Sequence, residues 1–270
     1  MPASPFDLSR MHREVTGPAD APAVVMVHGW GSSAQLMRPL AEALSGTLRV
    51  HNIDLPGHGH TPPPPEPWGV PEYAALIRGY IDAEIQQPFM WVGHSNGGRI
   101  GLYMAGDDQL KRGIERMALI SPSGVRPVRT WQYHARSTTA KVLKAPFQLL
   151  PETMRDAGLD WLRHSLVWSW LGSSDYQALD GVMRATFVKT VNMFVEDRLP
   201  NISIPVLLLW GDRDTAILRH QMDVLATQLP DAGLFVLDGA GHYGHLDALG
   251  AVAGGILSFA GVEAAEPVLS

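Results

Sequence analysis

Short apolar runs alternate with helix-like stretches along much of the chain, and this alternation limits the possible folds more than any other feature of the sequence. Strands are predicted where the runs lie, at Val24 to Val27, Leu48 to Ile53, Phe89 to Val92, Met117 to Ile120, Val206 to Trp210 and Leu234 to Leu237. Helical spacing is found at Ala34 to Leu44, Glu72 to Gln86, Gly97 to Ala105 and Arg219 to Leu229. Because parallel strands need crossover connections, we predict an α/β fold with a mostly parallel, doubly wound sheet of buried strands.

The alternation stops after Ser121, and about 80 residues pass before the strand predicted at Val206. A structureless loop of that length is implausible in a compact domain. Apolar residues recur at helical spacing in residues 136–150, 153–170 and 176–195. We therefore predict one α/β core, residues 1–125 and 204–270, with a helical cap inserted at residues 126–203.

The predicted cap is rich in aromatic side chains that suit either a packed interior or the wall of a substrate pocket. They are Trp131, Tyr133, Phe147, Trp161, Trp168, Trp170 and Tyr176. A small cap has to bury an apolar face of its own, so we expect most of these rings to be core and only a few to face a substrate.

Composition excludes several classes of function. The 27 acidic and 21 basic residues give a formal charge of −6, and no long Lys/Arg cluster is present, so nucleic acid is not an expected partner. The absence of cysteine excludes disulfides, thiolate metal sites and cysteine nucleophiles. No stretch has the apolar character of a signal peptide or the roughly 18 continuous apolar residues of a membrane span, so we expect a cytoplasmic protein.

Ser95 lies in a glycine-rich turn between a predicted strand and a predicted helix, in the run Gly93-His94-Ser95-Asn96-Gly97. A nucleophilic hydroxyl projects from a strained turn of this kind, which requires small residues two positions before and after it. Gly93 and Gly97 meet that requirement, and the following helix directs its N-terminal N–H groups at the same place. By itself the pattern also fits an ordinary strand-to-helix connection.

A serine nucleophile needs a histidine base, and the base in turn needs a carboxylate to orient it. Asp214 follows the strand predicted at Val206 to Trp210, and His242 follows the one at Leu234 to Leu237. Because the carboxyl ends of parallel strands share one edge of the sheet, we expect both side chains to lie on the edge that carries Ser95.

The order Ser95, Asp214, His242 and several further motifs resemble the α/β-hydrolase superfamily over nearly the whole chain outside the predicted cap. The motifs are His28-Gly29-Trp30-Gly31, Asp54-Leu55-Pro56-Gly57-His58-Gly59, Gly211-Asp212-Arg213-Asp214 and Gly239-Ala240-Gly241-His242. The resemblance implies that the backbone N–H groups of Trp30 and Asn96 form an oxyanion hole, and that no cofactor is used. A serine nucleophile separates the chain from the haloalkane dehalogenases and epoxide hydrolases, which use aspartate.

Two other residues are alternatives to the assigned acid and base. Asp212 precedes Asp214 but suits a turn better. His245, three residues after His242, is the alternative base, although His242 fits the pattern better.

The remaining polar residues near the motifs are assigned structural roles. We expect His94 to point away from the nucleophile, as a buried core histidine or one that supports the site without touching substrate, and His28 to shape its own loop through a backbone hydrogen bond. His28, His58 and His60 lie on separate loops without the spacing of a metal site, so no metal is expected. Asn96 stands where many relatives have an apolar residue, and its side chain offers an additional donor.

The expected activity is hydrolysis of a small to medium hydrophobic ester through an acyl-enzyme, with a small-molecule substrate as the expected partner. The same triad serves carbon–carbon bond hydrolases of vinylogous diketones, for which Arg126, Arg129 or Arg136 would hold a carboxylate. Lactonase, thioesterase and cofactor-free haloperoxidase activities also stay open. A receptor that binds a ligand on this fold without turnover is the alternative from another class.

Overall fold

The computed structural model describes residues 6–128, 146, 154 and 181–262. The chain divides into two compact units, Met1–Pro127 with Ala185–Ser270, and Val128–Arg184. The aromatic residues assigned to the cap, together with Arg129 and Arg136, lie outside the described residues, as do nearly all of the cap helices predicted at 136–150 and 153–170. The division into a core and a cap at 126–203 therefore remains a prediction.

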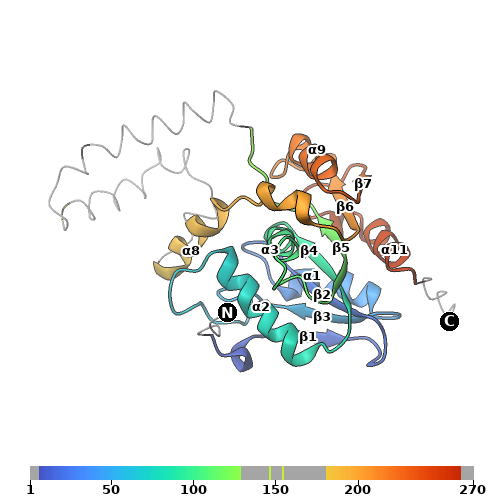
Figure 1. Cartoon of the computed structure of the whole chain (residues 1–270), viewed down its shortest axis with the longest axis horizontal. Coiled ribbons are helices and arrows are strands. Elements are labelled where there is room, and N and C mark those ends of the chain that lie inside the picture. Colours follow the sequence, from blue (N-terminus) through green and yellow to red (C-terminus); the bar gives the residue numbers. More distant parts are fainter. Residues whose placement is uncertain (1–5, 129–145, 147–153, 155–180, 263–270) are drawn as a thin grey trace. The chain divides into compact units, whose positions relative to one another are not determined.

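A seven-stranded sheet forms the centre of the larger unit, with the strand order β1-β3-β2-β4-β5-β6-β7 (Figure 1). The strands are β1 (Arg13–Thr16), β2 (Ala23–Val27), β3 (Arg49–Ile53), β4 (Phe89–His94), β5 (Ile114–Ile120), β6 (Val206–Gly211) and β7 (Ala232–Leu237). Strand β1 is antiparallel to β3, and every other pair is parallel. The predicted parallel sheet is confirmed, with β1 as an edge strand that the apolar runs did not indicate.

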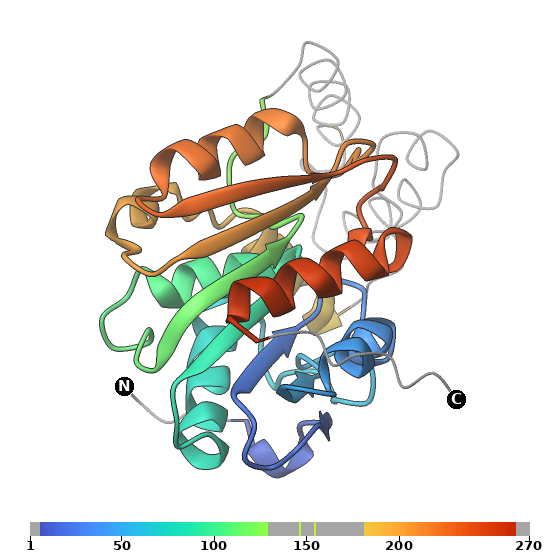
Figure 2. The ribbon, with the colours of Figure 1, turned by 90° about the vertical axis from the view of Figure 1, so that its right-hand side faces the viewer.

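Helices cover both faces of the sheet, which confirms the doubly wound arrangement (Figure 2). The helical elements are η1 (Leu8–Arg10), α1 (Ala34–Leu44), α2 (Val70–Glu84), α3 (Asn96–Ala105), α8 (Gly181–Val191), η2 (Glu196–Asn201), α9 (Arg219–Gln228), α10 (Gly244–Asp247) and α11 (Leu249–Ala260). Side chains of β2 alternate between the two faces: Val24 and Met26 pack with α1 and α11, while Val25 and Val27 pack with α2, α3 and α9. None of the described helices combines the length and the apolar character needed to cross a membrane.

Strand β7 differs from its prediction as a buried strand. It pairs only with β6 and forms the second edge of the sheet. Phe235 is 51% exposed and Val236 39% exposed. An apolar run of this length fits a central or an edge strand equally well, because the pattern does not show how many neighbours the strand has.

The carboxyl ends of β4, β5 and β6 lie side by side. His94 at the end of β4 is in register with Ile120 of β5, and Ile120 is in register with Leu209 of β6. The residues that follow these strands, Ser95, Ser121 and the segment ending at Asp214, consequently emerge at one edge of the sheet.

Candidate active site

Ser95 has a strained backbone. Its φ of 48° and ψ of −108° lie in a region that non-glycine residues rarely occupy. Its N–H donates to the carbonyl of Ile120 at 3.0 Å, and its carbonyl accepts from the N–H of Ser123 at 3.0 Å. These bonds to β5 and to the loop after it hold the turn in its strained form.

The glycines on either side of Ser95 have no room for a side chain. A Cβ on Gly93 would lie 2.7 Å from main-chain atoms of Gly97 and Gly98. A Cβ on Gly97 would lie 2.1 Å from the carbonyl oxygen of Val27. The expectation that both positions must be small is confirmed, because strand β4, helix α3 and strand β2 approach too closely for any larger residue.

Asp214 and His242 are brought together as predicted. The Nδ1 of His242 lies 2.9 Å from Oδ2 of Asp214. The other carboxylate oxygen, Oδ1, accepts from the N–H groups of Ala216 at 2.8 Å and Ile217 at 2.9 Å. Asp212 instead accepts from the N–H of Gly239 at 2.7 Å, so it holds a turn of the loop that carries His242.

Asp214 remains a carboxylate in this environment. Burial raises the pKa of its carboxyl group, but the hydrogen bonds from His242 and Ile217 and the charge of His242 outweigh burial and bring the pKa below its ordinary value. A charged Asp214 accepts the Nδ1 proton of His242, which leaves Nε2 of that ring as the basic nitrogen.

Ser121 is a neighbour of Asp214 for which no role was predicted from the sequence. It follows β5, between the strands that carry Ser95 and Asp214, and it is fully buried with a φ of 44°. Its hydroxyl makes a small contribution to the lowered pKa of Asp214, although it forms no hydrogen bond with any described residue. The sequence signal for this residue was a serine that directly follows the strand predicted between the strand of Ser95 and the strand of Asp214.

His94 does not point away from the site, so that expectation is wrong. Its ring centroid lies 4.8 Å from that of His242, and its Nε2 lies 3.0 Å from the main-chain oxygen of His242. Strand β4 ends with this side chain directed at the loop after β7, an orientation that sequence spacing does not determine.

His245 is the weaker of the two candidate bases. It is fully buried, neither ring nitrogen has a hydrogen-bond partner, and burial lowers its pKa to about 4. The carboxylate of Asp214 is bonded to His242 and not to His245.

The loop from His28 to Gly31 passes directly against the serine. A Cβ on Gly29 would lie 3.1 Å from Cβ of Ser95. The N–H of Trp30 has no hydrogen-bond partner among the described residues. Asn96 is the first residue of α3, so its N–H has no acceptor within that helix. Two unpaired donors therefore lie on the segments that flank Ser95.

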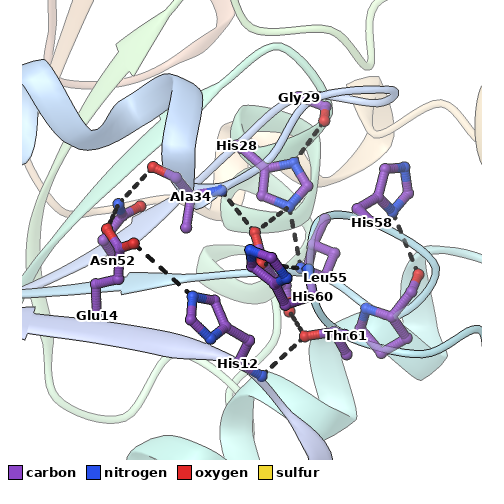
Figure 3. A network of polar contacts seen from close by, with 12 residues as sticks. His12, Glu14, His28, Gly29, Ala34, Asn52, Leu55, His58, His60 and Thr61 are labelled. Atoms are coloured by element: carbon purple, nitrogen blue, oxygen red, sulfur yellow. Dashed lines mark hydrogen bonds and ion pairs between the residues drawn. The ribbon is translucent and has the colours of Figure 1, made fainter.

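A polar network fixes the shape of this loop (Figure 3). The Nδ1 of His28 donates to the carbonyl of Gly29 at 2.7 Å, and its Nε2 accepts from the N–H of Leu55 at 3.0 Å. Burial lowers the pKa of His28 to about 3, so the ring is neutral and can donate at Nδ1 while it accepts at Nε2. Asp54 joins the same network by accepting from the N–H groups of Ala34 at 2.6 Å and His60 at 2.9 Å.

His28, His58 and His60 do not gather into a metal site. Within the part of the chain that the structure describes, no group of three or more His, Asp or Glu side chains is arranged to hold a metal ion. The rings of His28 and His58 lie 5.2 Å apart, and the ring of Trp30 packs on His58 at 4.8 Å. These contacts make His58 a packing partner of the loop that carries Trp30.

The geometry is that of a known family. A family model described as the alpha/beta hydrolase fold matches residues 22–249. This chain belongs to the α/β-hydrolase family. The predicted resemblance is thereby confirmed, and the α/β-hydrolase fold with it.

Relatives of this α/β-hydrolase include named enzymes. A pimeloyl-(acyl-carrier protein) methyl ester esterase of Xanthomonas campestris pv. campestris is 27% identical over 256 residues, which cover 88% of this chain and 94% of the relative. The magnesium-chelatase 30 kDa subunit of Rhodobacter capsulatus is 31% identical over 255 residues, covering 90% of this chain and 88% of that one. The crystal structure of the enol-lactonase from Burkholderia xenovorans LB400 shares the fold, with a TM-score of 0.68, 20% identity, and coverage of 93% and 96%. The chain is a hydrolase of this family, with esterases among its relatives.

Proposed function

We propose that this α/β-hydrolase cleaves small to medium hydrophobic carboxylic esters, with Ser95 as nucleophile, His242 as general base and Asp214 as its orienting acid. The observation that carries the proposal is the 2.9 Å bond between His242 and Asp214 on the sheet edge where the strained Ser95 stands. A histidine oriented by a buried carboxylate is the base that an unactivated serine hydroxyl requires. The relatives named as methyl ester esterases support an ester as substrate.

The proposed reaction transfers an acyl group to water in two steps. His242 removes the proton from the hydroxyl of Ser95 as its oxygen attacks the ester carbonyl, and the N–H groups of Trp30 and Asn96 bind the oxyanion. Collapse of this intermediate expels the alcohol, which takes the proton from His242. Water then attacks the acyl-enzyme with His242 again as base, which releases the acid and restores Ser95.

The test compares purified wild-type protein with Ser95→Ala on p-nitrophenyl esters of increasing acyl length. We expect Ser95→Ala to lose turnover and labelling by a fluorophosphonate probe, since both need the activated hydroxyl. Ser123→Ala is the matched control, because this nearby serine contacts the turn through its main chain. Unchanged turnover in Ser95→Ala would overturn the assignment of the nucleophile.

The acyl-length series also tests the substrate class. A sharp optimum in kcat/KM is expected if the pocket is fitted to a hydrophobic acyl chain. Uniformly feeble rates on all esters, with probe labelling intact, would instead indicate carbon–carbon bond hydrolysis or another reaction of the same serine. Ligand-induced stabilisation without labelling or product would indicate a receptor.

A further inference from the structure

His94 joins the turn that carries Ser95 to the loop that carries His242. It is the last residue of β4 and directly precedes Ser95. Its Nε2 lies 3.0 Å from the main-chain oxygen of His242, 148 residues further along the chain. Among the described residues, this is the only hydrogen bond to the main chain of His242.

The protonation state of His94 follows from this contact. A carbonyl oxygen only accepts, so Nε2 of His94 carries the proton and donates it to His242. Burial, reinforced by the neighbouring His245 and His242, holds the pKa of His94 well below its ordinary value, so the ring stays neutral with the proton in place.

The ring of His94 is confined on its other sides as well. It is 1% exposed, and the ring of His245 lies 4.7 Å from it. Its Nδ1 is buried without a hydrogen-bond partner, and a Cβ on Gly29 would lie only 2.9 Å from that nitrogen. A side chain enclosed on all these sides has one orientation available, which fixes the direction of its Nε2.

We propose that His94 is a positioning residue that sets the distance between Ser95 and His242. The inference rests on the proposed roles of those two residues. The structure contains no direct hydrogen bond between Ser95 and His242, and the bond to Asp214 holds the His242 ring at Nδ1 only. The bond from His94 holds the main chain of His242, so together the two bonds locate His242 relative to the nucleophile.

The experiment removes the donor while keeping the ring. His94→Phe loses the Nε2 proton, and His94→Gln places an amide N–H close to where Nε2 was. A displacement of about 1 Å in a catalytic group costs up to about 100-fold in rate, so His94→Phe is expected to lower kcat about 10- to 100-fold with little change in KM. His94→Gln is expected to restore most of this loss, which a purely space-filling role would not produce.

His245→Phe is the matched control. It removes an imidazole of similar burial, 4.7 Å from His94, that makes no hydrogen bond. Its kcat is expected to stay within about threefold of wild type, since no group that locates His242 is lost. An equal loss in His94→Phe and His245→Phe would overturn the proposal, because both would then act only through packing.

A second measurement needs no substrate and separates this proposal from the proposed function. The Nδ1 proton of His242, bonded to Asp214, is followed by proton NMR in the resting protein. We expect its resonance to shift or broaden in His94→Phe, and to be retained in His94→Gln and His245→Phe. An unperturbed resonance in His94→Phe would refute the positioning role even if kcat fell.

If wild-type protein hydrolyses no ester, the proposed function fails and the resonance alone decides the role of His94. Should His94→Phe not fold, His94→Ala carries the same expectations, because it removes the donor without adding volume.

Discussion

Asn96 offers a test of the site through stability. Its side chain is 3% exposed, and neither the oxygen nor the nitrogen of the amide has a hydrogen-bond partner among the residues that the structure describes. Burying an amide without partners costs about 1–3 kcal/mol in proteins. Leucine has the same branching and heavy-atom count as asparagine, so Asn96→Leu removes this cost without opening a cavity. We expect it to raise the free energy of unfolding by about 1–3 kcal/mol.

The control is another buried asparagine, whose amide nitrogen is bonded although its Oδ1 has no partner among the described residues. Asn52 is fully buried, and its Nδ2 donates to the carbonyl of Ala34 at 2.8 Å. Asn52→Leu removes the bonded Nδ2 together with the unpaired Oδ1, so the two effects offset and the free energy of unfolding is expected to change by less than about 1 kcal/mol. The larger gain in stability is therefore expected at Asn96.

Urea unfolding measures both variants, with the midpoint read at a constant m-value. In a chain of 270 residues each kcal/mol corresponds to about 2–4 °C in Tm, so Asn96→Leu should melt a few degrees higher. The N–H of residue 96 survives the substitution, so the proposed oxyanion hole predicts that a fluorophosphonate still labels Ser95. Destabilisation of Asn96→Leu would show that the amide of Asn96 is satisfied in solution.

Three further predictions follow from the same contacts. Gly97→Ala forces a Cβ to within 2.1 Å of the Val27 carbonyl oxygen, so this variant should unfold at a markedly lower urea concentration. Gly254→Ala is the control, because a Cβ there meets no atom within 4 Å, and its free energy of unfolding should rise by up to about 1 kcal/mol. Equal unfolding midpoints for the two variants would refute the close approach at Gly97. Asp214→Asn should lower kcat by on the order of 10⁴-fold with the fold intact in circular dichroism, and a loss below tenfold would mean that Asp214 does not orient the base. Between pH 6.5 and about 3, His28 is protonated in the unfolded chain but stays neutral in the folded protein, where it is buried. The free energy of unfolding should therefore fall as pH falls through this window. His28→Gln should flatten that fall, and an unchanged slope between pH 7 and pH 4 in urea titrations would contradict it.

The sequence predicted the central sheet well because buried parallel strands produce continuous apolar runs. Helix α1 begins and ends where its spacing indicated, at Ala34 and Leu44. Strand β1 was missed because Arg13–Thr16 is short and half-buried, with no apolar face that a pattern could show. Helix α11 was missed for the opposite reason, since Leu249–Ala260 is apolar on most sides and rich in glycine, which hides the helical period.

For the candidate site, the sequence predicted which residues to consider and that Asp214 and His242 lie close together, but not the contact of His94. Motif order identified Ser95, Asp214 and His242, and parallel topology placed Asp214 beside His242. The contact of His94 with His242 depends on how the loop after β7 folds back over the end of β4. No spacing in the sequence encodes that approach, so His94 was assigned to the wrong side of the turn.

Within the part of the chain that the structure describes, the strained non-glycine residues lie at this one edge of the sheet. Among the described residues, Ser95 and Ser121 are the only non-glycine residues with positive φ, and they follow neighbouring strands. Buried polar atoms without partners among the described residues lie close by, on His94, Asn96, Ser121 and His245, but others lie elsewhere in the core. Backbone strain persists only where the surrounding structure imposes it. The position of both strained serines beside the Asp214–His242 pair therefore supports the proposed catalytic role of this edge.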